Sequence, residues 1–486
     1  MKPAVLSLLL LAGCHPGAAP IAAQSIFGAF EDDYGSRYVI SETEWLHEGY
    51  ARYLIQEVNT EEQYVIARNH DDNPSGGGLW SRIDWMQLEG MPPYEWAYCL
   101  TAFEAGSKQE AQSTPAANRA TPRTGCGGHP FSRMKPALPG RLMTIAGLSF
   151  IQSEFRAGAG EAELAISDLD GDGRPEVVVT SSSDETITVL RGSGYGNLSA
   201  GDPHPAGERP THLLVHDLDG DGSQEILIAN HETDYLTLLS EAGESWVPSR
   251  LEAPVGPHPH FVVATDLNQD GHLDILVDDR QAEGVLVLEG DGSLLFREKG
   301  RVDMGGDPYL GFVVTDINGD GRPDVITPNP DVVGLAFGRG DGRFGSPTTY
   351  DTGFAPSAVA ACDMNGDSHP DLITASGEGG REVAIALNDG SGAFLSHFEH
   401  STVRGLKKLA TGDVNADGHC DVLVVSWNGG TTLLLGGPEG IESAPVSVDG
   451  NPWGIAMGDL NGDGLDDLLI ADGQTDRIQL YLSQSR

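Results

Sequence analysis

The sequence predicts an all-β fold in which a small N-terminal β domain, a meander or barrel, precedes a seven-bladed β-propeller. Three observations lead to this prediction. An acidic loop recurs seven times at intervals of roughly 46 to 50 residues, the length of one four-stranded propeller blade. Apolar runs rich in β-branched residues lie before and after these loops. The 64 Gly and 29 Pro residues favour short strands joined by tight turns over long helices.

The first residues predict export. An apolar run from Ala4 to Ala12, too brief to span a bilayer, leads into Leu-Ala-Gly-Cys at Cys14. This resembles a bacterial lipoprotein signal, so residues 1–13 are expected to be removed, Cys14 to carry the lipid, and residues 14–29 to form a tether. An ordinary secretory signal cut near Ala22 or Ala23 is the alternative. Under either interpretation the protein is exported.

The formal net charge of −43 limits the partners and the location. A chain this acidic repels nucleic-acid phosphates and anionic lipid headgroups. Nucleic acid is therefore excluded as a partner, and membrane contact is expected only through the lipid anchor. Because His15 rather than Asp follows Cys14, the usual inner-membrane retention signal is absent. In a host with two membranes this favours the outer membrane or the cell surface.

Residues 30–105 predict a small aromatic-rich β domain. Five short runs, among them Arg37–Ile40 and Arg52–Ile55, combine aromatic and β-branched residues between Asn, Asp, Gly and Pro clusters. Residues 106–140, rich in Pro, Ser, Thr and Ala, lack hydrophobic periodicity and are expected to be a linker. Cys99 and Cys126 either form a disulfide, which export permits, or are two unrelated thiols.

Residues 141–486 contain the seven repeats. Oxygen-bearing side chains occupy the first, third, fifth and ninth positions of every loop, and Gly occupies the sixth position of all but one. The residues at the four oxygen-bearing positions are Asp168, Asp170, Asp172, Glu176; Asp217, Asp219, Asp221, Glu225; Asp266, Asn268, Asp270, Asp274; Asp316, Asn318, Asp320, Asp324; Asp363, Asn365, Asp367, Asp371; Asp413, Asn415, Asp417, Asp421; and Asp459, Asn461, Asp463, Asp467.

The chemistry of these positions predicts calcium sites. The four side chains converge only if the backbone curls tightly, which Gly at the sixth position permits. Zinc prefers nitrogen or sulfur ligands and magnesium tolerates irregular cages poorly, so carboxylate and amide oxygens indicate Ca²⁺. Up to seven Ca²⁺ ions are therefore expected, with the weakest site in the fifth loop, where Ser368 replaces Gly. The alternative is that the acidic turns merely solvate the loop tips.

The blade pattern resembles a known family. Apolar strands such as Phe312-Val313-Val314 lead into the loops and others leave them. Phe337-Gly338 and Gly342-Arg343-Phe344 match the third-strand ending and the following turn of the FG-GAP/VCBS repeat family, calcium-loop propellers related to integrin α-subunit heads. The resemblance covers roughly residues 142 to 486. It implies a calcium-binding propeller that acts in adhesion or recognition.

Closure of the ring is expected to use the start of this domain. After the seventh loop the chain has room for only two more strands, so the last blade lacks its outer strand. Residues 148–155, ahead of the first loop, have the pattern of a strand without a blade. We expect them to complete the seventh blade, because this removes an exposed sheet edge.

The start of each lead-in strand is expected near the mouth of the central channel, on the face opposite the calcium loops. These positions form a candidate ligand rim: His212, His258, His260, Tyr309, Lys407 and Trp453. Imidazoles, a cation and an indole suit a sugar or a peptide loop, and a solvated rim without a ligand is the alternative. Cys362 and Cys420, which adjoin neighbouring calcium loops, are expected to be buried thiols.

The leading functional hypothesis is an exported, lipid-anchored, calcium-binding propeller that recognises a protein or a glycan without catalysis. A calcium-dependent carbohydrate-active enzyme similar to polysaccharide lyases is the alternative, because His, Tyr and Lys on the rim are residue types that act as bases. A third hypothesis is a structural presenter that holds the N-terminal domain away from the membrane. The sequence shows no nucleophile elbow or phosphate-cradling loop, so no catalytic residue is assigned.

Overall fold

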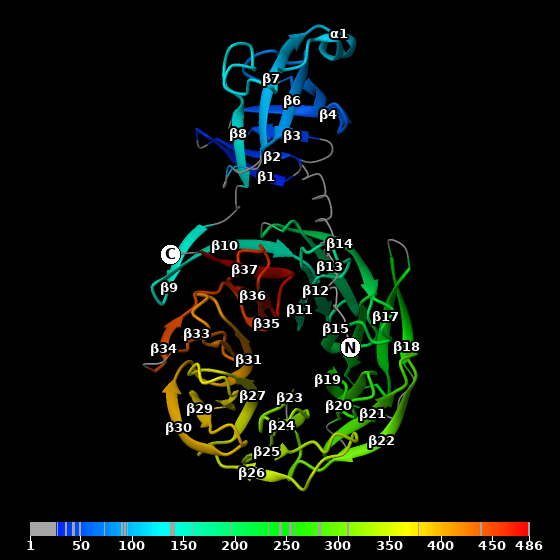
Figure 1. Cartoon of the computed structure of the whole chain (residues 1–486), viewed down its shortest axis with the longest axis vertical. Coiled ribbons are helices and arrows are strands. Elements are labelled where there is room, and N and C mark those ends of the chain that lie inside the picture. Colours follow the sequence, from blue (N-terminus) through cyan, green and yellow to red (C-terminus); the bar gives the residue numbers. More distant parts are fainter. Residues whose placement is uncertain are drawn as a thin grey trace, which may run out of the picture. The chain divides into compact units, whose positions relative to one another are not determined.

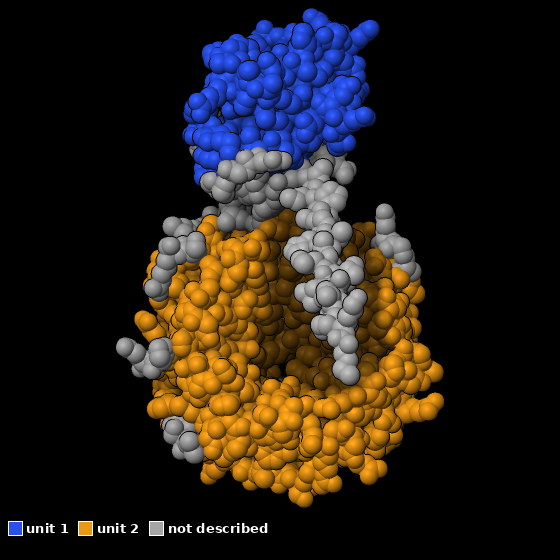
Figure 2. All heavy atoms as spheres, viewed as in Figure 1, with its two compact units in different colours: residues 1–137 blue, residues 138–486 orange. Residues whose placement is uncertain are grey.

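The computed structural model divides the chain into two compact units, residues 1–137 and 138–486, which Figure 2 colours separately. It describes residues 26–484 except positions 27, 35, 41–43, 48–49, 72, 89–90, 92–93, 95, 137–140, 159, 195, 232, 243–244, 252–254, 257, 280–282, 309–310, 378 and 438–439. The expected signal segment 1–13, Cys14, which was expected to carry the lipid, and the expected rim residue Tyr309 lie outside the described residues. No helix in the described part is long and apolar enough to cross a bilayer.

Unit 1 is a closed antiparallel barrel of eight strands in which each strand pairs with the next and the last pairs with the first. The strands are β1 (Gly28–Asp32), β2 (Arg37–Ile40), β3 (Glu44–His47), β4 (Ala51–Asn59), β5 (Tyr64–Asn69), β6 (Trp80–Gln87), β7 (Trp96–Ala105) and β8 (Ser132–Pro136). Phe30, Trp45 and Trp96 form its aromatic core, where the rings of Phe30 and Trp45 each meet Trp96 edge to face. Burial of such large rings dominates the stability of a small barrel.

The barrel extends beyond the boundary expected at residue 105. The stretch expected to be a linker, residues 106–140, contains the short helix α1 (Lys108–Ser113), whose N-cap Ser107 accepts a hydrogen bond from the Glu110 amide, and strand β8. β8 closes the barrel by pairing with both β7 and β1. The structure also joins Cys99 on β7 to Cys126. Strand pairing and the disulfide therefore tie this polar stretch to the barrel.

Unit 2 is a seven-bladed propeller, with the blades arranged around a central channel (Figure 1). Every blade is an antiparallel sheet, and in the first six blades the strands follow chain order from the channel outwards. The first three blades are β11 (Leu164–Ser167), β12 (Glu176–Ser181), β13 (Thr186–Gly192), β14 (Leu198–Pro205); β15 (Pro210–His216), β16 (Glu225–Asn230), β17 (Leu236–Ala242), β18 (Ser245–Leu251); and β19 (Pro259–Thr265), β20 (Asp274–Asp279), β21 (Val285–Gly290), β22 (Phe296–Val302). The next three are β23 (Val313–Thr315), β24 (Asp324–Pro328), β25 (Val333–Ala336), β26 (Thr348–Tyr350); β27 (Pro356–Cys362), β28 (Asp371–Ser376), β29 (Glu382–Asn388), β30 (Phe394–Ser401); and β31 (Leu406–Gly412), β32 (Asp421–Ser426), β33 (Thr431–Leu435), β34 (Glu442–Pro445).

The seventh blade combines both ends of the unit. Its strands, from the channel outwards, are β35 (Pro452–Gly458), β36 (Asp467–Asp472), β37 (Arg477–Gln484), β10 (Leu148–Arg156) and β9 (Arg141–Ile145). β10 pairs with β37 from Ser149 opposite Gln484 to Arg156 opposite Arg477, which is the position expected of the closing strand. The fifth strand, β9, was not expected. Ring closure thus depends on pairing between the two ends of the unit.

The second strand of each blade is the most buried part of the propeller. Val177, Val178 and Val179 on β12 are fully buried because neighbouring blades cover both faces of the sheet. Complete burial explains why these strands are continuous apolar runs rather than alternating ones. Each such side chain contributes about 1.5 to 3 kcal/mol relative to an exposed position. The second strands are therefore the rigid part of the blades.

One expectation about the propeller's cysteines was wrong. Cys362 and Cys420 are not separate buried thiols but form a disulfide, with their Cα atoms 6.0 Å apart. Cys362 ends β27 in the fifth blade and Cys420 precedes β32 in the sixth. Blade packing brings the two residues together although 58 positions separate them in the sequence. The disulfide therefore links two neighbouring acidic loops.

Candidate functional site

The seven acidic loops share one hydrogen-bond pattern. In the first loop, the Asp168 carboxylate accepts hydrogen bonds from the backbone amides of Asp172 and Gly173, at 3.1 and 2.9 Å. The Glu176 carboxylate reaches back to accept from the Leu169 amide at 3.0 Å. Corresponding bonds occur in the other six loops. The backbone is therefore curled around the acids in every copy.

This curl gathers the predicted ligand residues. In the first loop, oxygens of Asp168, Asp170 and Glu176 all lie within 4.8 Å of one another, and the equivalent three acids of the second loop do the same. Such acidic clusters have the composition and spacing of a cation site, although acids also gather at exposed turns without an ion. The quartets of the other loops occupy the same positions in their blades.

The ninth residue of each loop is the buried member of its quartet. Asp467 is fully buried, and desolvation, together with the charges of Asp463 and Asp459, raises its pKa to about 8. Burial likewise raises the pKa of Asp421 to about 7 and that of Asp324 to about 6. A carboxylate in this environment is costly to ionise without a nearby cation. Either a bound cation or a proton on the ninth residue would therefore relieve the repulsion within a loop.

Two positions of the loop take a left-handed backbone conformation. Ser368, at the sixth position of the fifth loop, has a φ of 69°, in the region that Gly occupies in the other loops. The fourth position also requires a positive φ, and Gln269 and Ala416 adopt it there at 61° and 52°. This second requirement was not predicted from the sequence. Residues with a Cβ atom are strained in this region, so three of the seven loops carry a local backbone cost.

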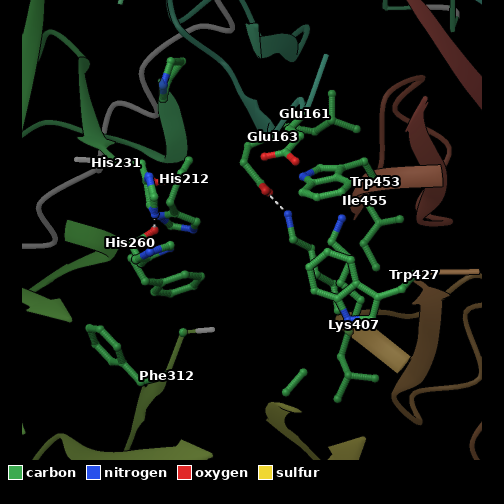
Figure 3. Close-up of a pocket in the computed structure, with 18 of the residues that line it drawn as sticks. Glu161, Glu163, His212, His231, His260, Phe312, Lys407, Trp427, Trp453 and Ile455 are labelled. Carbon is green, nitrogen blue, oxygen red and sulfur yellow. Dashed lines mark hydrogen bonds and ion pairs between the residues drawn. The ribbon is translucent and has the colours of Figure 1, made fainter. Parts of the chain in front are cut away.

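A second candidate site lies in the central channel, at the end of the blades opposite the acidic loops. The first strand of each blade starts at this end and runs into the acidic loop, and the second strand returns to it. The propeller is hollowed at this centre (Figure 2), and a cavity of about 380 Å³ lies between the innermost strands. Figure 3 shows that imidazoles on one side of the cavity face lysines and indoles on the other.

The lysine and indole wall comes from the sixth and seventh blades. Lys407 is only 1% exposed, and its Nζ atom lies over the Trp453 ring and 4.6 Å from the centre of the Trp427 ring. The two indoles meet edge to face with ring centres 5.3 Å apart. Burial lowers the pKa of Lys407 to about 6, opposed by the charge of Glu161. Lys408, the next residue, forms an ion pair with Glu163.

The imidazole wall comes from the second and third blades. His212 stacks on Phe261 with ring centres 3.6 Å apart, and its Nδ1 atom accepts a hydrogen bond from the Val262 amide at 3.4 Å. Burial lowers the pKa of His212 to about 3, so the ring is neutral and its Nε2 atom carries the hydrogen. The His231 ring lies 4.5 Å from that of His260. This wall therefore offers a neutral imidazole at His212 beside two further histidine rings.

The structure brings together four of the six predicted rim residues. His212, His260, Lys407 and Trp453 line the cavity. His258 is not among the lining residues, although its ring lies 5.0 Å from that of His231. Tyr309 lies outside the described residues.

Part of the cavity wall was not predicted from the sequence. The unpredicted lining residues include Glu161, Glu163, Arg209, His231 and Trp427. His231 and Trp427 follow directly after the second strands of their blades, β16 and β32. A residue with a bulky ring directly after the second strand of a blade could have been predicted to line the cavity, because the second strand ends at the channel.

Solved structures of low sequence identity share the fold of this chain. Among solved structures, BBS1N in complex with ARL6DN, soaked with mercury, matches with a TM-score of 0.51 at 10% identity, covering 69% of this chain and 97% of that chain. A lectin from Agrocybe aegerita, whose structure concerns recognition of non-reducing terminal N-acetylglucosamine, matches with a TM-score of 0.46 at 14% identity, covering 92% of this chain and 100% of that chain. No curated protein matches.

The family comparison is more specific. A model described as an FG-GAP-like repeat matches residues 168–228, 217–277, 266–327, 316–374, 363–424 and 413–470. These six overlapping matches include all seven acidic loops. Because together they span more than half of the chain, the protein belongs to the family of FG-GAP-like repeat proteins.

Proposed function

We propose that the protein is a calcium-binding recognition module that binds a saccharide in the central cavity of its propeller, without catalysis. The observation that carries this proposal is the composition of the cavity wall. Trp427 is 39% exposed and offers an indole surface, and the neutral ring of His212 and the amine of Lys407 supply polar groups nearby. Binding sites for small ligands combine a concave apolar surface with a few placed polar groups in this way.

The chemistry of sugars fits this wall. A pyranose ring has C–H groups on its faces and hydroxyl groups around its edge. An indole packs against the C–H face, whereas imidazole nitrogens and amines bond to the hydroxyls. The cavity volume of about 380 Å³ lies near the lower end of the range for small-molecule sites, which begins at about 300 Å³. The proposed ligand is therefore the end of a glycan rather than a long segment of it.

Calcium has a structural role in this proposal. The four oxygen-bearing residues of each loop would hold one ion, so the propeller would take up to seven. The support is the clustering of acids in the loops and the raised pKa of their buried members. The ions would neutralise the repulsion within each loop and thereby hold the blades at the spacing that forms the cavity. The proposal also includes export and anchoring through Cys14, at the outer membrane or cell surface.

The test is binding of the full-length chain to immobilised glycans, in calcium and in chelator. We expect retention on at least one glycan in calcium and a loss of retention in chelator. Trp427→Ala is expected to remove retention, because it deletes the exposed indole. Phe398→Ala is the matched control, since Phe398 is 54% exposed on the outer strand β30. Retention that survives Trp427→Ala, or no retention on any glycan, would overturn the proposal.

One observation favours a second candidate, a calcium-dependent carbohydrate-active enzyme of the polysaccharide lyase type. Burial lowers the pKa of Lys407 to about 6, so at neutral pH the amine is mostly unprotonated and able to accept a proton. The same incubations distinguish the candidates when they are followed by chromatography. New cleavage products that disappear in the Lys407→Met variant would show that the protein is an enzyme rather than a recognition module.

A further inference from the structure

We propose that the saccharide bound in the central cavity is acidic, and that Lys407 holds its carboxylate. This inference rests on the proposed function and adds the class of ligand. It would make the cavity selective for sugars of the uronic-acid type over neutral hexoses of the same configuration.

The first support is the position of the Lys407 amine. The side chain begins near the start of β31, is 1% exposed, and lines the cavity. Its Nζ atom has no hydrogen-bond partner among the described residues and lies over the faces of two indoles. A buried ammonium group without a hydrogen-bonded counter-ion is costly, so such groups are retained where something compensates them. A ligand carboxylate in the cavity supplies both a charge and hydrogen-bond acceptors.

The second support is the charge of the lining. The whole chain has 72 acidic residues against 29 Lys and Arg residues. The cavity reverses this ratio, because Lys407, Lys408 and Arg209 line it together with only Glu161 and Glu163. Lys408 is engaged by Glu163. In a chain that is strongly acidic elsewhere, this lining can hold one anionic group when Lys407 is protonated.

The third support is the arrangement of the two walls. Figure 3 shows Lys407 and Trp427 on one side and His212, His231 and His260 on the other. A sugar whose carboxylate meets Lys407 would have its ring beside Trp427. Its far hydroxyls would point towards the imidazoles, where the Nε2–H group of His212 is a donor. The wall thus provides separate places for the acid group and the hydroxyls.

Binding of an acid at Lys407 should take up a proton. Lys407 is mostly neutral above its lowered pKa, and a carboxylate beside it would favour the charged form again. The affinity for acidic sugars is therefore expected to rise as the pH falls from 8 to 6, by up to about tenfold per pH unit. Glu161, Glu163, Lys408 and Arg209, together with the three lining histidines, also face this cavity. A Lys407 variant is therefore needed to assign the effect.

The experiment is isothermal titration of the calcium-loaded, full-length chain with matched sugars. The probes are the methyl glycosides of glucuronic, galacturonic and mannuronic acid, each paired with the corresponding neutral hexoside. Titrations at pH 6 and pH 8, in two buffers of different ionisation enthalpy, also measure proton uptake. The variant is Lys407→Met, with Lys299→Met as the matched control because Lys299 pairs with Glu289 on the outer blade edge. Thermal unfolding checks that both variants are folded.

We expect at least one acid to bind tenfold or more tightly than its neutral partner at pH 6, with uptake of about half a proton at pH 6 and up to about one proton at pH 8. Lys407→Met should remove this preference and the proton uptake, and Lys299→Met should leave both unchanged. Equal binding of acid and neutral sugar, or a preference that survives Lys407→Met, would overturn the inference and leave the proposed function standing. If no sugar binds and the glycan panel is also negative, the proposed function fails, and the inference with it.

Discussion

Replacing Lys407 by Met is expected to stabilise the propeller while it removes the preference for acidic sugars. Met has a similar length and no charge, and the amine that it replaces has no hydrogen-bond partner among the described residues. The wild-type chain has to bury this amine in a site where its pKa falls from 10.5 to about 6. A lysine whose pKa falls on folding loses its proton at neutral pH when the chain folds. This proton loss lowers the free energy of unfolding.

The size of the effect follows from the pKa difference. Between pH 6 and pH 10.5 the unfolded chain binds one proton more than the folded chain at this residue, so wild-type stability rises with pH over this window. At pH 7, burial of the amine lowers the free energy of unfolding by about 1.4 kcal/mol for each pH unit between 7 and 10.5, which gives about 5 kcal/mol as an upper bound. At pH 9 only about 2 kcal/mol remains. The stabilisation by Lys407→Met should therefore shrink as the pH rises.

The assay is calorimetric unfolding of the full-length chain in calcium at pH 7 and pH 9, following the transition of the propeller. Lys299→Met is the control, because Lys299 lies on the outer strand β22 and forms a partly exposed ion pair with Glu289. We expect that variant to change stability by at most about 1 kcal/mol. A Lys407→Met variant that is less stable than wild type at pH 7, or a gain that does not depend on pH, would refute the reasoning.

Three further predictions concern the acidic loops and the disulfide between them. Replacing both Cys362 and Cys420 by Ser should lower the free energy of unfolding by about 2 to 5 kcal/mol in urea titrations, and equal stability would argue against the disulfide. Ser368→Gly should raise stability by about 1 kcal/mol and strengthen calcium binding at the fifth loop, because it relieves a positive φ; weaker binding in a calcium titration would contradict this. Asp467→Asn should lower the calcium stoichiometry by one and the free energy of unfolding by about 1 to 3 kcal/mol. The two carboxylate oxygens of Asp467 accept hydrogen bonds from the Leu460 and Ser483 amides, whereas Asn has only one oxygen that can accept. Its control, Asp476→Asn at an exposed residue paired with Arg156, should change the stoichiometry not at all.

The sequence was sufficient for the features that repeat or that depend on local spacing. Seven copies of one loop predict seven blades, because each copy has to end one strand and start the next. The strand near residues 148–155 was predictable by counting, since the last blade lacked one strand. Among the rim positions, His212 and Lys407 could be placed because they start strands that run into an acidic loop. These are consequences of chain order and strand length.

Features that depend on long-range register were not predictable. Strand β8 lies in a stretch without an apolar pattern. It is a strand because its backbone pairs with both β7 and β1, which closes the barrel. The Cys362–Cys420 disulfide depends on how neighbouring blades pack. Trp427 follows a second strand, where the sequence indicates only a turn. Its contact with Trp453 arises when adjacent blades converge at the channel.

The most direct test of the account is a crystal structure of the calcium-loaded protein with the acidic saccharide that binds most tightly. We expect the sugar in the central cavity, with its carboxylate within hydrogen-bond distance of the Lys407 Nζ atom and its ring beside Trp427. We also expect a calcium ion within the acidic loops. A sugar bound elsewhere on the propeller or on the barrel, with the central cavity filled only by water, would contradict the account.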